Sequence, residues 1–127
     1  MKKLLIASCM ALALPTAAFA DVAAELTVAD QHAGFAAKAT TIDMVHMHLH
    51  HSLNCLVGPA GTGFDTTVAN PCAKQGNGAI PDSTDAAQKA KLQTAVGQLN
   101  TGLAATDMTA AAKSATDAST TIGGAKM

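Results

Sequence analysis

The chain has 127 residues, with eight lysines, no arginine, nine acidic residues and a formal net charge of −1. Its aromatic side chains, other than five histidines, are three phenylalanines. The lack of a basic stripe and the scarcity of stacking rings argue against binding of nucleic acid or of anionic lipid.

The first 20 residues have the parts of a secretory signal peptide. Lys2 and Lys3 are followed by an apolar run over 4–14 and by the small-x-small cleavage site Ala-Phe-Ala at 18–20. That run is too short to cross a membrane, which takes about 20 apolar residues. We therefore expect a signal peptide over 1–20 and one mature domain over 21–127. The domain is expected in the periplasm or secreted, with no membrane span after cleavage.

Two cysteines, Cys55 and Cys72, remain after Cys9 has left with the signal peptide. An even pair in an oxidising compartment indicates a disulfide. Closing a loop of this size stabilises a small domain by about 3 kcal/mol in the chain-entropy model. We predict a Cys55–Cys72 disulfide that ties the following loop to the helix that carries Cys55.

Apolar residues recur at steps of three and four through residues 23–57, which predicts helix. Gly34 is the expected break between a short first helix and a longer second one. Gly58 and Pro59 are expected to end the second helix. Residues 58–82 contain five glycines and three prolines, so we expect a long irregular loop there.

Helical spacing returns after the capping residues 81–84 and continues through Leu103. Thr106 and Asp107 then cap an Ala-rich helix that is expected over 108–121. The predicted fold class is all-α, a small bundle of three to four helices with one long disulfide-linked loop.

Four histidines lie within MVHMHLHHSLNC, residues 44–55. On a helix, His46 and His50 are four positions apart and lie one above the other, so both rings can bind one ion. Asp43, three positions before His46, is a third ligand or the acceptor that orients a ring. Met47 borders this group, and these four residues are the predicted metal site.

A second group lies on the opposite side of the same helix. It contains Met44, His48, His51 and Cys55, and a disulfide removes the thiolate of Cys55 from it. We therefore assign Met44, His48 and His51 an accessory role. His32 is also accessory, because an unbroken helix places it on the His46 side but two to three turns away.

Imidazole and carboxylate ligands suit copper(II), zinc, nickel or iron(II), and a thioether favours copper(I). The sequence therefore predicts a transition-metal-binding protein for buffering, delivery or sensing, with copper first and zinc or nickel next. Because binding needs neutral imidazole, affinity is expected to fall below about pH 6, near the ordinary histidine pKa.

Other functions have less support. The C-x-x-C-H motif of covalent haem is absent, and few large side chains are available to line a pocket for b-type haem. No catalytic motif is present, so we expect no enzyme activity. The remaining alternative is a structural module that packs on a second copy or on a periplasmic protein, with the histidines as a pH-sensitive patch.

Overall fold

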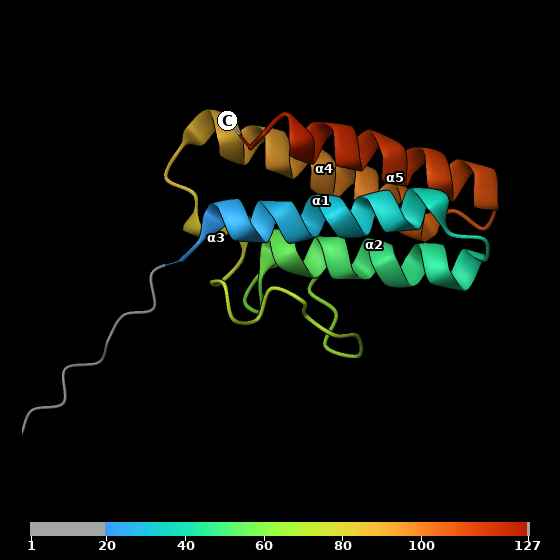
Figure 1. Ribbon diagram of the computed structural model, residues 1–127, viewed down its shortest axis with the longest axis horizontal. Helices are drawn as coiled ribbons and strands as arrows, with labels where there is room; N and C mark the ends of the chain where they lie inside the picture. Colours follow the sequence, from blue (N-terminus) through green and yellow to red (C-terminus); the bar gives the residue numbers. More distant parts are fainter. Residues whose placement is uncertain (1–19, 127) are drawn as a thin grey trace, which may run out of the picture.

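The computed structural model describes residues 20–126, which form a helical bundle (Figure 1). The predicted all-α class is confirmed, and apart from Ala20 the expected signal peptide lies outside the described residues. The described part contains five helices, four of them substantial: α1 Val22–Lys38, α2 Ile42–Val57, α3 Ala79–Asp82, α4 Ala86–Ala104 and α5 Met108–Gly123.

The four long helices lie side by side, and consecutive ones run in opposite directions (Figure 1). α1 packs against α2 and α5, while α4 packs against α5 and α2. The interior combines large aliphatic side chains with many alanines, and its fully buried large members are Leu26, Val45, Leu49, Leu53, Leu56, Leu92, Leu99 and Ile122. In the described residues no helix is long and apolar enough to cross a membrane.

Each long helix begins at a polar residue whose side chain accepts a hydrogen bond from a backbone N–H three positions later. These N-cap residues are Asp21, Thr41, Asp85 and Asp107. Such a bond satisfies one of the four free N–H groups at a helix start and stabilises the helix by about 1 kcal/mol. The cap at Asp107 was predicted, and the N-cap of α4, Asp85, lies one residue after the capping segment 81–84 that the sequence indicated.

The expected break at Gly34 is wrong. Gly34 lies inside α1, and the chain reverses instead at residues 39–41, where Ala39 is extended and Thr41 caps α2. Threonine is β-branched and has a low helix propensity, so a position outside the helix costs little free energy, and its hydroxyl is a good N-cap. The first helix is therefore longer than predicted, and α2 folds back along it.

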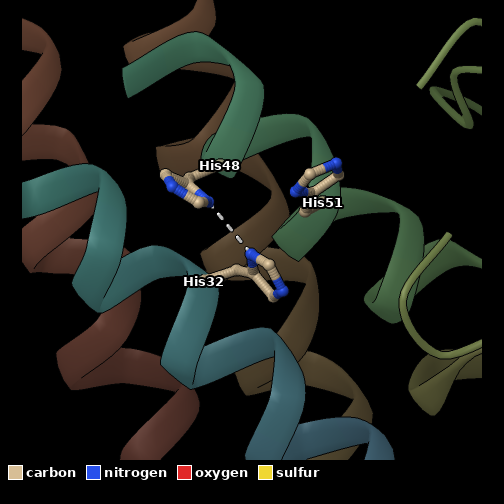
Figure 2. A group of neighbouring side chains, drawn as sticks. All are labelled: His32, His48 and His51. Carbon is tan, nitrogen blue, oxygen red and sulfur yellow. Dashed lines mark hydrogen bonds between the residues drawn. The ribbon is translucent and has the colours of Figure 1, made fainter. Parts of the chain in front are cut away.

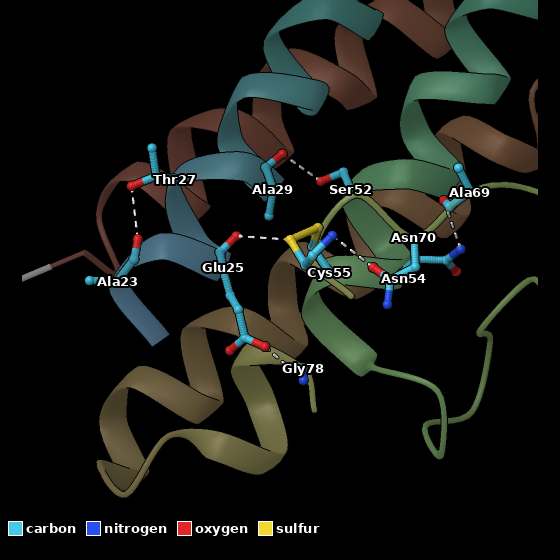
Figure 3. The surroundings of a disulfide bond; sticks show 11 residues. Ala23, Glu25, Thr27, Ala29, Ser52, Asn54, Cys55, Ala69, Asn70 and Gly78 are labelled. Atoms are coloured by element: carbon cyan, nitrogen blue, oxygen red, sulfur yellow. Dashed lines mark hydrogen bonds between the residues drawn. A yellow bond between two sulfur atoms is a disulfide. The ribbon is translucent and has the colours of Figure 1, made fainter. Parts of the chain in front are cut away.

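The disulfide between Cys55 and Cys72 is present, with the two Cα atoms 5.2 Å apart. It connects the end of α2 to the loop over 58–78 (Figure 3). The sequence predicted a loop over 58–82, but residues 79–82 form the single helical turn α3. Asn54 strengthens the same connection, because its amide accepts a hydrogen bond from the Asp65 N–H and donates one to the Asp65 carbonyl.

The end of the loop is held by Glu25, a fully buried residue of α1. Its Oε1 atom accepts a hydrogen bond from the Gly78 N–H at 2.9 Å (Figure 3). Gly78 has a φ of 114°, and a Cβ atom there would lie 2.5 Å from the Gly58 nitrogen, so glycine is required. Burial is the main cause that raises the pKa of Glu25.

Candidate metal centre

The reversal at residues 39–41 brings three histidines together between α1 and α2. His32 comes from α1, and His48 and His51 come from successive turns of α2 (Figure 2). All three side chains are partly buried. Their ring centroids lie 4.8 to 5.8 Å apart. We call these three residues the histidine triad.

The spacing of the nitrogen atoms in the triad suits a metal ion. One ligand atom from each ring lies within 4.8 Å of the other two. Tetrahedral coordination with metal–nitrogen bonds of 2.0–2.1 Å requires nitrogens about 3.3 Å apart. The Nδ1 atoms of His32 and His48 are 3.1 Å apart, which is close to this spacing.

A metal ion bound by the triad would replace the hydrogen bond between His32 and His48. Two imidazole nitrogens at 3.1 Å can share a hydrogen bond only if one of them carries a hydrogen. The Nδ1 atom of His51 is buried and has no hydrogen-bond partner among the residues that the structure describes. A buried nitrogen without a partner is costly, and a bound cation would satisfy it.

The surroundings favour the uncharged form of each ring in the triad. Burial, followed by the charges of His51 and His48, lowers the pKa of His32 to about 4. Burial also lowers the pKa of His48, and burial together with the charges of His48 and His50 lowers the pKa of His51. Neutral rings have the free lone pairs that metal binding needs.

The two histidines predicted as the main ligands point to other partners. The Nε2 atom of His46 lies 3.0 Å from the Ala105 carbonyl oxygen, which only accepts, so this nitrogen carries the hydrogen. The Nδ1 atom of His50 lies 3.4 Å from the Asp65 carboxylate, an ion-pair distance without hydrogen-bond geometry. Asp43, their predicted third member, is exposed.

Within residues 20–126, the histidine triad is the group of three or more His, Cys, Asp or Glu side chains with spacing suited to a metal. The structure does not bring His46, His50 and Asp43 into such a group. His32, His48 and His51, which the sequence indicated as accessory, form the centre, and Cys55 is excluded from it by the disulfide.

Sequence reasoning missed how His32 joins the other two. On one unbroken helix His32 is too far from His48 and His51 to meet them, but a reversal between them places the residues side by side. The signal was present at Thr41, a good capping residue followed by the acidic first-turn residue Asp43.

One large apolar side chain contacts the triad, and two more lie near it in the helical register of α2. The Phe35 ring lies 5.7 Å from the His32 ring and 5.4 Å from the His48 ring. Met44 and Met47 occupy the same face of α2 as His48 and His51. Phe35, Met44 and Met47 are also the large hydrophobic residues that the described part of the chain exposes most.

Comparisons with family models, with curated proteins and with solved structures find no match.

Proposed function

We propose that this protein binds a transition-metal ion through the histidine triad and serves to buffer, deliver or sense that ion. One observation carries the proposal: three imidazoles from two helices converge, with one ligand atom of each within 4.8 Å of the others. Two helices that meet in a folded hairpin hold their ligands in a fixed arrangement, which a flexible histidine-rich segment does not.

The chemistry of the ligands favours copper, with zinc or nickel next. The triad offers neutral imidazoles alone, because the disulfide makes the thiolate of Cys55 unavailable. Imidazole suits copper, zinc and nickel, and divalent copper binds nitrogen ligands more tightly than the neighbouring metals do. Three protein ligands leave one position for water, or for a ligand from the molecule that supplies or receives the metal.

A periplasmic or secreted location is part of the proposal. It is supported by the signal-peptide pattern at residues 1–20 and by the Cys55–Cys72 disulfide, which is typical of an oxidising compartment. The proposed role is binding, since the triad consists of residue types that act as metal ligands.

Calorimetric titration of the domain over 21–127 with copper(II), zinc and nickel tests the proposal. We expect one ion per chain, bound tighter than micromolar, and a weakening on the order of 100-fold in His32→Ala. His32 is the informative position because it lies on α1, so its loss affects a site between helices and leaves the HLHH segment of α2 intact.

His46→Ala is the matched control, because it also removes one partly buried histidine, and it should keep the wild-type affinity. Wild-type affinity in His32→Ala together with weakening in His46→Ala would mean that α2 alone binds metal and that the triad does not. If the wild-type domain binds none of the three ions tighter than micromolar, a histidine patch that acts in protein contacts is the better account.

A further inference from the structure

The exposed methionines of α2 have no role in the site described so far. Met44 is 44% exposed and Met47 is 39% exposed, and Phe35 at 46% completes the set of exposed large hydrophobic side chains among residues 20–126. Single exposed apolar residues are ordinary on protein surfaces. The concentration of all three around one group of histidines is what calls for an explanation.

The helical register places each methionine one turn before a histidine of the triad. Met44 precedes His48 by four positions, and Met47 precedes His51 by four. Residues four apart on a helix have Cβ atoms about 5–6 Å from each other. Residues four apart lie one above the other on the same face of a helix, so each methionine neighbours one histidine of the triad.

A methionine thioether differs from imidazole as a metal ligand in two useful ways. Its sulfur is soft, so it selects copper(I) over zinc and over divalent nickel. It is neutral and does not take up a proton in the physiological range, and its three rotatable bonds let the sulfur adapt to a nearby ion.

We propose that Met44 and Met47 extend the histidine triad into a mixed imidazole–thioether site that binds copper in its reduced state, copper(I). This inference rests on the proposed function and names the ion and oxidation state that the site is built to take. Phe35, packed against the rings of His32 and His48, forms an apolar cover on the α1 side. Such a cover limits access of water to the ion.

The test compares affinities for copper(I) and for zinc in the double variant Met44→Leu/Met47→Leu. Leucine keeps the helix propensity and nearly the volume of methionine but has no sulfur. Copper(I), kept reduced by ascorbate without oxygen, is titrated against the coloured chelator bicinchoninate. We expect roughly tenfold or greater weakening for copper(I), and zinc affinity within about twofold of wild type.

The matched control is Met108→Leu, which removes the sulfur of a partly buried residue at the start of α5. It should leave copper(I) affinity unchanged. X-ray absorption of the copper(I) form supplies a second readout, with a sulfur shell expected for wild type and for Met108→Leu but not for the double variant.

The outcomes separate this inference from the proposed function. Unchanged copper(I) affinity in the double variant, or a wild-type spectrum without sulfur, overturns the thioether site while a histidine site stands. An equal loss of zinc and copper(I) also overturns it, because the methionines would then act through packing. A wild-type domain that binds no metal ion overturns both proposals.

Discussion

Two pairs of histidines on α2 have nearly the same sequence spacing and quite different surroundings. His46 and His50 are four positions apart, and His48 and His51 are three apart. The first pair faces the Ala105 carbonyl and the Asp65 carboxylate, which are separate partners. The second pair faces His32 of α1, and the three rings meet (Figure 2).

The difference shows that spacing within one helix is a weak guide to a metal site. A pair of histidines three or four positions apart makes a well-formed metal site only where its nitrogens are free and a further ligand lies opposite. The packing of α1 against α2 supplies that ligand to one pair, while the packing of α4 and the loop over 58–78 engages the other pair.

The largest expected effect is on metal binding in double variants. His48→Ala/His51→Ala removes two ligands and should weaken binding of copper(II) or zinc by at least about 1000-fold, or about 4 kcal/mol. His46→Ala/His50→Ala removes the same number of imidazoles from the same helix and should retain binding within a fewfold. Calorimetry on both variants measures the contrast. A greater loss of affinity in His46→Ala/His50→Ala would mean that His46 and His50, and not His48 and His51, bind the metal.

A somewhat smaller effect is expected on folding when the disulfide is removed. Cys55→Ser/Cys72→Ser should lower the free energy of unfolding by about 3 kcal/mol, as measured by urea denaturation. The loop that carries Asp65, the partner of His50, should loosen, but the triad lies between α1 and α2. Metal affinity of the folded variant should therefore stay near wild type, and a large loss would show that the loop supports the site.

The third prediction concerns pH and revises the expectation from the sequence alone. Because burial lowers the pKa of His32 to about 4 and lowers that of His48 and His51, protons compete with metal at a lower pH than for free imidazole. Zinc affinity should therefore stay nearly constant from pH 7 to about pH 6, where the sequence alone predicts that the fall begins, and should decline only at a lower pH. A tenfold fall within that range would mean that the rings titrate as exposed histidines do.

The same pKa values set the direction of acid unfolding without metal. A histidine whose pKa is lower in the folded state takes up its proton preferentially on unfolding. The metal-free domain should therefore lose stability as the pH falls from about 6.5 towards 4. His32→Ala should flatten this dependence, which thermal unfolding at several pH values will show.

The smallest expected effect is that of His46→Ala on stability. This variant removes the hydrogen bond between His46 Nε2 and the Ala105 carbonyl and should lower the free energy of unfolding by about 1 kcal/mol. Metal affinity should not change. A structural role for His46 would be contradicted if stability stayed the same while metal affinity fell.

Much of the fold follows from local patterns in the sequence. Apolar spacing marks the helices. The cap at Asp107 marks the start of α5, and the glycine–proline pair after Val57 marks the end of α2. The disulfide follows from an even cysteine pair together with the signal-peptide pattern at residues 1–20, which predicts an oxidising compartment. These features depend on a few neighbouring residues or on the compartment, so a single sequence contains the information.

The site depends on which helix faces which, and that is not a local property. Gly34 was expected to break the helix, yet it lies inside α1, and a Cβ atom there would meet nothing within 4 Å, so no close contact requires a glycine at this position. The actual reversal at 39–41 changes the neighbours of His32 altogether. The five histidines could be identified as candidate ligands, but their grouping required the pairing of α1 with α2.

The histidine run of α2 also has a consequence for the denatured chain. Four imidazoles within six residues can chelate a metal ion before any helix forms, using His46 and His50, which the native bundle engages elsewhere. A ligand that binds both states raises the melting temperature by less than its native affinity implies. Thermal-shift screening would therefore understate the metal affinity of the proposed site, and ions should be ranked by direct titration.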